Sequence, residues 1–357
     1  MRRLQSLFIG ILGIIVLLAF VIMHLESSDT TDDKGTLIIY NWGDYIDPDL
    51  LSKFEKESGL KIIYETFDSN EAMFTKIKQG GTPCDIAVPS EYMISKMQKQ
   101  SLLYKLDHSR LAGLDNISKF FFKHSSDRLN IYSIPYFWGT LGIVYNDQMI
   151  KGKPPLHWRD LWDLKYKNNI MLIDGARDVL GFGLKSLGYS INSKDKEQLQ
   201  QVADKLEKMT PNVKAIVADE IKMYMAQNEA AVAVTYSGEA TEIIEHNRHL
   251  HYVIPSEGSN YWFDDIVIPK AAKNIKGAYQ FINFILRPEN AAQNAEYIGY
   301  ATPNEKALQF LPKNVREDPK VYPDEKVLNT LEVYQDLGAK WLEIYNNLYL
   351  EFKMYRN

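Results

Sequence analysis

The sequence predicts an α/β fold with two lobes. Short apolar runs alternate with amphipathic helices at a spacing that indicates parallel strands joined by right-handed crossovers. Two sets of this kind are separated by an extended segment rich in aromatic and β-branched residues. The chain has 357 residues, 45% of them hydrophobic, so it is long enough for two domains of about 150 residues and too apolar for a disordered protein.

The first set of elements begins at residue 36. The apolar run 36–40 indicates a buried strand, and Asp47-Pro48 then opens a helix that Gly59 closes. Further strands are predicted at 61–67 and 85–88, and further helices at 71–79 and after Ser90.

An extended segment at 134–145 separates the two sets. The second set comprises strands at 169–173, 214–217, 230–236, 251–254 and 263–269, with helices at 176–187, 196–209, 219–228 and 239–246. Helices are also predicted at 275–286, 289–298, 324–335 and 340–354. We expect residues 36–142 plus 266–314 to form one lobe, and residues 143–265 plus 315–357 to form the other.

Residues 1–25 are predicted to be a membrane anchor, and residues 26–35 a flexible polar linker. The run 4–25 has no acid, Lys or Arg, and at 1.5 Å per residue it can cross a bilayer core of about 30 Å. Basic residues precede the run and acids follow it, which places the remainder outside the cytoplasm. The residues before the linker are bulky and lack a small-residue cleavage site, which favours a retained anchor over a cleaved signal peptide.

Composition excludes several classes of function. A net charge of -5 disfavours a nucleic-acid partner. The single cysteine, Cys84, allows neither an intrachain disulfide nor a cysteine-rich zinc site. The sequence contains no nucleophile elbow, dinucleotide-binding fingerprint or phosphate-binding loop. We therefore expect neither an enzyme nor a cofactor.

Two local patterns suggest enzyme chemistry and are better explained structurally. His246, His249 and His251 lie close together, but their spacing fits no standard zinc motif, and basic residues suit the end of the preceding helix. Ser193 and Lys196 match a Ser–Lys pattern, but they open a polar helix, where serine is a favoured cap.

Carboxylates and aromatic rings stand at nearly every predicted strand end. Ligands of open α/β sheets bind at these ends. Taken in chain order, the candidate binding residues are Trp42, Asp44, Tyr45, Ser90, Glu91, Tyr92, Asp174, Asp178, Tyr236, Trp262, Asp264, Tyr300 and Gln335. Rings attract ammonium groups by about 0.5–2 kcal/mol each, and a charge-assisted hydrogen bond adds about 1.5–3 kcal/mol. The pattern therefore favours an aliphatic polycation, although Asp44 and Asp178 taken alone could simply favour a helix start.

The motifs at these positions resemble the spermidine/putrescine-binding (PotD) family, the receptors of polyamine ABC transporters. The resemblance covers residues 36 to the C-terminus and rests on the segments 41–46, 89–93, 135–140, 176–177 and 299–304. It implies a type II periplasmic-binding-protein fold whose two lobes close on the ligand, with 139–145 and 266–269 among the segments that cross between the lobes.

The same resemblance implies roles for individual residues. In the first lobe it matches Trp42, Tyr45, Ser90 and Tyr92 to ligand contacts. It also matches Trp262, Asp264, Tyr300 and Gln335 to contacts along the ligand chain, with Asp264 pairing an ammonium group. Three positions depart from the family: Asp178 replaces a glutamate, Gly175 replaces an acid, and Tyr236 replaces a tryptophan.

We therefore expect a monomeric, extracytoplasmic receptor for spermidine or putrescine that passes its ligand to an ABC permease with its ATPase. The alternatives are the same fold binding a sugar, an iron–anion complex or another cation, and a surface sensor or adhesion protein without a transport role.

Overall fold

The computed structural model describes residues 35–80, 83–124, 127, 129–218 and 220–355. The predicted anchor and, apart from Gly35, the predicted linker lie outside these residues. None of the helices in the described ranges combines the length and the apolar character that crossing a membrane would require.

The strands form one sheet that runs through the molecule in the order β2-β1-β3-β9-β4-β7-β5-β6, with β8 paired to β4. The strands are β1 (Thr36–Trp42), β2 (Lys61–Phe67), β3 (Ile86–Ala87), β4 (Ser133–Asn146), β5 (Ile170–Ile173), β6 (Val213–Val217), β7 (Val232–Tyr236), β8 (Leu250–Val253) and β9 (Tyr261–Val267). Each predicted strand is present with its ends shifted by a few residues, and the strand predicted at 85–88 is reduced to two residues.

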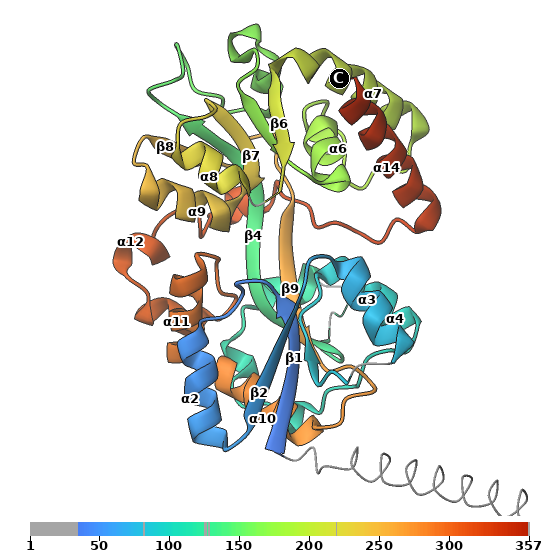
Figure 1. Cartoon of the computed structure of the whole chain (residues 1–357), viewed down its shortest axis with the longest axis vertical. Coiled ribbons are helices and arrows are strands. Elements are labelled where there is room, and N and C mark those ends of the chain that lie inside the picture. The colour runs from blue at the N-terminus through green and yellow to red at the C-terminus, as the bar shows by residue number, and fades with distance from the viewer. Residues whose placement is uncertain (1–34, 81–82, 125–126, 128, 219, 356–357) are drawn as a thin grey trace, which may run out of the picture.

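The sheet has two halves. In the β1 half, β1 pairs in parallel with β2 and β3, and in the β5 half, β5 pairs in parallel with β6 and β7. The long strand β4 connects them: its first part pairs antiparallel with β9, and its second part pairs antiparallel with β7 and β8. Figure 1 shows β4 and β9 running between the two halves.

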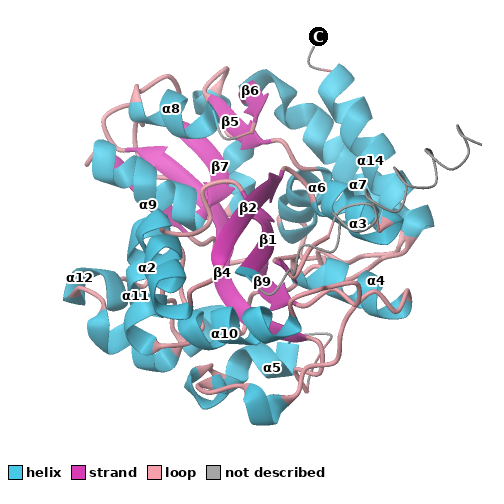
Figure 2. Ribbon diagram, turned by 60° about the horizontal axis from the view of Figure 1, so that its bottom comes forward, coloured by secondary structure: helices cyan, strands magenta, loops and turns pink. Residues whose placement is uncertain are grey.

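Helices pack on both sides of this sheet, as Figure 2 shows. The β1 half carries α2 (Pro48–Ser58), α3 (Asn70–Gln79), α4 (Glu91–Lys99), α5 (Lys119–His124), α10 (Ile275–Ile285) and α11 (Pro288–Ile298). The β5 half carries α6 (Ala176–Lys185), α7 (Lys196–Met209), α8 (Glu220–Ala226), α9 (Ser237–His246) and α14 (Ala339–Met354). Two short helices, α12 (Lys313–Arg316) and α13 (Glu325–Leu328), lie between α11 and α14 in the chain.

The ends of α2 follow the rules used to predict them. The Asp47 side chain accepts a hydrogen bond from the backbone N–H of Asp49 at 2.9 Å, which satisfies a donor that the first helical turn leaves free. At the other end Gly59 has φ 73°, a left-handed conformation that favours glycine. Both predicted caps are confirmed.

The prediction of a helix at 324–335 is wrong beyond its first turn, because α13 ends at Leu328. The backbone of Glu332 instead forms a parallel bridge with Asn260. This pairing uses backbone groups that a continuing helix would need. Residues 331–338, which we call the C-terminal strap, therefore run as an extended segment to α14.

Each half has its own hydrophobic core. In the β1 half, Phe54 packs edge-on against Phe281 and Phe284, with ring centroids 5.2 and 5.3 Å away. In the β5 half, Trp158 stacks on Phe182 at 5.3 Å, and both rings are almost completely buried. Two cores joined by long strands are the architecture expected of two lobes, while the residue boundaries assigned to the lobes stay a prediction.

Candidate functional site

Side chains from both halves meet beside the crossing strands β4 and β9. The predicted residues brought together there are Tyr45, Ser90 and Tyr92 from the β1 half, Asp178 and Tyr236 from the β5 half, Trp262 and Asp264 on β9, and Tyr300 after α11. We call this group the candidate site. It contains two buried carboxylates linked by aromatic rings.

Asp264 is the first buried carboxylate, with 5% of its surface exposed. The Tyr45 hydroxyl donates to its Oδ2 at 2.8 Å, and the Ser90 hydroxyl lies within hydrogen-bonding reach. Its Oδ1 is buried without a hydrogen-bond partner, and no cation pairs with it in the part of the chain that the structure describes. Desolvation raises the pKa of Asp264 to about 6, despite the opposing hydrogen bonds. An ammonium group at Oδ1 would supply the missing donor.

Asn70 fixes the position of Ser90. Its Nδ2 donates to Ser90 Oγ at 3.0 Å, and its Oδ1 accepts the Ser90 backbone N–H at 3.0 Å. Tyr92 stands two residues further, where desolvation raises its pKa. Both Asp264 and Asp178 contribute to that rise, so Tyr92 lies within electrostatic range of both carboxylates.

A row of rings joins the two carboxylates. The Tyr45 and Tyr300 ring centroids are 5.9 Å apart, Tyr300 meets Trp262 edge-on at 4.8 Å, and Trp262 meets Tyr236 edge-on at 6.0 Å. Two glycines make this packing possible. A Cβ at Gly139 would lie 2.7 Å from the Trp262 ring, and one at Gly238 would collide with Tyr300.

Asp178 is the second buried carboxylate, with 7% of its surface exposed, and it lies in the first turn of α6. The Tyr334 hydroxyl donates to its Oδ1 at 3.0 Å, and the Tyr236 hydroxyl is within hydrogen-bonding reach. Desolvation raises the pKa of Asp178 above its ordinary value. Its Oδ2 lies over Gly175, where any side chain would collide with it. Two positions that depart from the family pattern therefore serve Asp178. Glycine at 175 makes room for its carboxylate, and tyrosine at 236 contacts it.

The remaining predicted residues lie apart from this group or contribute less directly. Asp174 accepts from the Tyr349 hydroxyl at 2.5 Å and from Lys353 Nζ at 3.0 Å, so α14 already uses both of its oxygens. Asp44 is exposed, with φ 47°. Gln335 contacts its neighbours through its backbone N–H and carbonyl, and it is exposed.

Trp42 and Glu91 lie beside the candidate site rather than in its row of rings. Trp42 ends β1, and its ring centroid is 4.5 Å from that of Phe67; its indole Nε1 is buried without a hydrogen-bond partner in the described residues. Glu91 is a buried first-turn acid of α4, which the helix dipole favours.

Sequence reasoning missed Tyr334. The only signal was its position directly before the candidate residue Gln335 near the C-terminus. A helix was predicted there, and only the strap, which the structure shows in its place, brings the hydroxyl to Asp178.

The histidine cluster does not form a metal site. His249 Nδ1 and His251 Nε2 lie 3.1 and 2.9 Å from the two oxygens of Asp147, and all three side chains are partly exposed. Among the described residues, no three histidine, cysteine, aspartate or glutamate side chains are arranged to hold a metal ion.

The replacement Asp264→Asn should stabilise the empty protein at about pH 7.5. Because burial raises the pKa to about 6, ionising Asp264 costs stability as the pH rises from about 4 through 6. Asparagine removes that cost, which is about 2–3 kcal/mol, and the gain should vanish below about pH 4. Urea unfolding at several pH values measures this gain in the free energy of unfolding.

Asp174→Asn is the control and should give no gain in the free energy of unfolding, because the Asp174 pKa is lowered. A gain from Asp264→Asn that is independent of pH would contradict the burial argument.

Comparisons with known proteins identify the family. The family model for bacterial extracellular solute-binding proteins matches residues 49–323. The spermidine/putrescine-binding periplasmic protein of Escherichia coli (strain K12) is 38% identical over 328 residues, which cover 92% of this chain and 94% of that protein. The putrescine-binding periplasmic protein PotF of the same strain is 32% identical over 344 residues, which cover 89% of this chain and 92% of that protein.

Solved structures agree with this assignment. The spermidine/putrescine ABC transporter substrate-binding protein PotD from Streptococcus pneumoniae has a crystal structure that matches this one with a TM-score of 0.84. The two sequences are 60% identical, and the match covers 90% of this chain and 99% of that chain. The TpPotD lipoprotein of Treponema pallidum is 27% identical, with a TM-score of 0.80, and covers 89% of this chain and 99% of that chain. These similarities confirm the predicted α/β fold of a solute-binding protein. The chain belongs to the bacterial extracellular solute-binding proteins, a family of receptors rather than enzymes.

Proposed function

We propose that this chain is an extracytoplasmic receptor that binds a polyamine, spermidine or putrescine, at the candidate site and delivers it to an ABC permease with its ATPase. The observation that carries the proposal is Asp264, a buried carboxylate with an unused oxygen and no cationic partner in the described part of the chain. The names of the relatives from Escherichia coli and Streptococcus pneumoniae support the same ligand class.

The chemistry of the site matches a slender diamine or triamine. One ammonium group would pair with Asp264 and another with Asp178, each gaining a charge-assisted hydrogen bond of about 1.5–3 kcal/mol. The methylene chain between them would lie against the rings of Trp262 and Tyr300. A sugar would use the rings but would leave two buried carboxylates without a positive partner, which is costly.

Binding requires the two halves to move relative to each other. Tyr300, which follows α11 of the β1 half, lies against Gly238 in α9 of the β5 half, so side chains occupy the space between the carboxylates. We infer that β4 and β9 flex as the halves separate, admit the ligand and close again. No covalent chemistry is needed, because the receptor only captures and releases its ligand.

The proposal also includes a location at the outside of the cell membrane and a monomeric state. A retained anchor at residues 1–25 would hold the receptor at the cell membrane, outside the cytoplasm, and would raise its effective concentration at the permease. A monomer is sufficient, because each of the two carboxylates and each ring of the row comes from this one chain.

Calorimetric titration of the purified chain tests the ligand class. Spermidine or putrescine should release heat of binding, whereas maltose and ferric citrate should give none. Asp264→Asn should weaken polyamine binding at least about tenfold, because it removes the charge that pairs with the ammonium group. Asp174→Asn is the matched control and should stay within about twofold of the wild type, since its oxygens serve α14. Absence of heat with both polyamines would end the proposal.

Cell fractionation tests the anchor. The full chain should appear in the membrane fraction, and sequencing its N-terminus should find residue 1 or 2, because bulky residues precede the linker and offer no cleavage site. A chain whose residues 1–25 are replaced by a cleavable signal peptide should appear in the soluble extracytoplasmic fraction. A mature N-terminus inside residues 20–35 would contradict a retained anchor.

A further inference from the structure

The C-terminal strap reaches the candidate site through Tyr334. In Figure 1 the strap crosses the middle of the molecule on its way to α14. The Tyr334 hydroxyl donates to Asp178 Oδ1 at 3.0 Å. It is the one side chain of the strap for which a bond to a candidate-site carboxylate is seen in the described residues.

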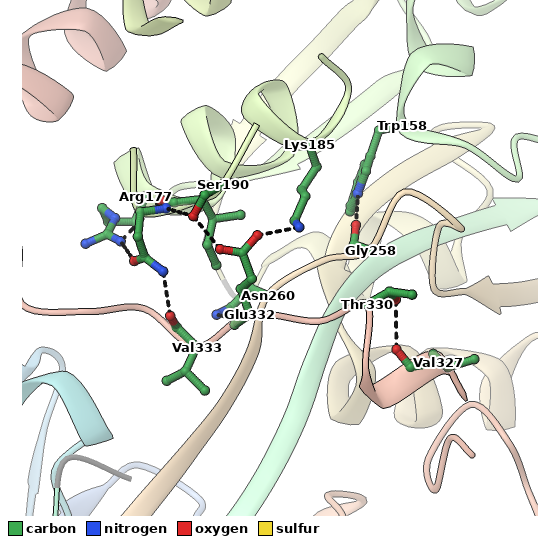
Figure 3. Close-up of polar contacts among 12 residues, drawn as sticks. Trp158, Arg177, Lys185, Ser190, Gly258, Asn260, Val327, Thr330, Glu332 and Val333 are labelled. Carbon is green, nitrogen blue, oxygen red and sulfur yellow. Dashed lines mark hydrogen bonds and ion pairs between the residues drawn. The ribbon is translucent and has the colours of Figure 1, made fainter. Parts of the chain in front are cut away.

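Two hydrogen bonds fix the backbone on either side of Tyr334. The Asn192 side chain holds both neighbouring residues: its Nδ2 donates to the Val333 carbonyl at 2.8 Å, and its Oδ1 accepts the Gln335 N–H at 2.8 Å. Figure 3 shows the bond to Val333. Because one amide side chain bridges both flanking residues, the strap backbone at Tyr334 cannot move away from Asn192 without breaking two hydrogen bonds.

Two residues before Tyr334, Glu332 connects the strap to the β5 half. It forms an ion pair with Lys185, which is mostly buried, and accepts from the Ser190 hydroxyl, as Figure 3 shows. Lys185 belongs to α6, the helix whose first turn carries Asp178. The strap and Asp178 are therefore fixed to the same helix.

The Tyr334 ring is held as firmly as its backbone. The Arg177 guanidinium lies 4.5 Å from the Tyr334 ring centroid and 5.2 Å from that of Tyr345, so it contacts both rings. Arg177 donates to Asn192 Oδ1 at 2.8 Å and to the Gln335 carbonyl at 3.2 Å. Burial raises the pKa of the neighbouring Asp178, and the charge of Arg177 opposes this rise by favouring the ionised form, together with the Tyr334 and Tyr236 hydroxyls.

Space for the hydroxyl comes from Gly181. A Cβ at this position on α6 would lie 3.1 Å from the Tyr334 hydroxyl oxygen, closer than most carbon contacts allow. Gly181 is buried in the helix interior, where glycine costs up to about 1 kcal/mol relative to alanine. Its presence there is explained by the hydroxyl that it accommodates.

We propose that Tyr334 is a positioning residue of the receptor: its clamped hydroxyl holds the Asp178 carboxylate in the orientation and the ionised form that bind the second ammonium group of a polyamine. The inference rests on the proposed function and extends it to a residue outside the ligand contacts predicted from the sequence. A hydroxyl that donates to a carboxylate favours its charged form and opposes the effect of burial on its pKa.

Titration of the full-length protein with putrescine and spermidine between about pH 5.5 and 8.5 tests the role. Tyr334→Phe keeps the ring against Arg177 and removes only the donor. It should weaken binding roughly tenfold near pH 7. Its loss of affinity on acidification should also begin at a higher pH than in the wild type, because Asp178 without its donor takes up a proton more readily.

Tyr345→Phe is the matched control. It also lies against Arg177 and loses a buried hydroxyl, but that hydroxyl donates to the Ser193 carbonyl at 2.9 Å. Its affinity should stay within about twofold of the wild type at every pH. Gly181→Ala keeps the Tyr334 hydroxyl, crowds it and favours the helix, so a folded variant with the same pH shift as Tyr334→Phe is expected.

Two results would overturn the role of Tyr334. One is wild-type affinity for both Tyr334→Phe and Gly181→Ala, and the other is weakening by the same factor at every pH. Failure of the wild-type chain to bind either polyamine would be a different result, because it would remove the proposed function itself.

Discussion

The site depends on one constraint, which is that two carboxylates are buried and form no ion pair in the described part of the chain. Asp264 and Asp178 have given up most of their hydration, and hydroxyl groups replace only part of it. Desolvation raises the pKa of both groups, so the empty protein is less stable with them ionised. Such an arrangement is costly for a fold and useful for a receptor, because a cationic ligand supplies the missing charge.

The two buried carboxylates lie at positions where a movement of the two halves can relieve their desolvation. Asp264 lies on β9, one of the strands between the halves, whereas Asp178 begins a helix of the β5 half. The strap adds a further link, since Asp336 accepts from Lys99 Nζ of α4 in the β1 half at 2.7 Å. Neighbouring strap residues thus contact both halves, which couples the arrangement of the site to the separation of the halves.

Local sequence patterns predicted the elements and named most of the residues that the structure brings together, because strand ends are set by short-range rules. Tyr45 and Asp264 could be named since they stand at or beside strands whose apolar runs are unambiguous. The failures come from long-range contacts. Glu332 pairs with a segment about seventy residues earlier, so helical propensity at 324–335 was overridden and Tyr334 was missed. Asp174 follows a strand as Asp178 does, but α14 folds back over it, which no local pattern reveals.

The most direct test of this account is the number of protons released when a polyamine binds. Calorimetry in two buffers of different ionisation enthalpy measures it. In the empty protein Asp264, with its pKa raised to about 6, is partly protonated near pH 6, and pairing with an ammonium group requires it to ionise. The account predicts release of a fraction of a proton near pH 6 and almost none near pH 8. Tight binding with no proton release at either pH would contradict it.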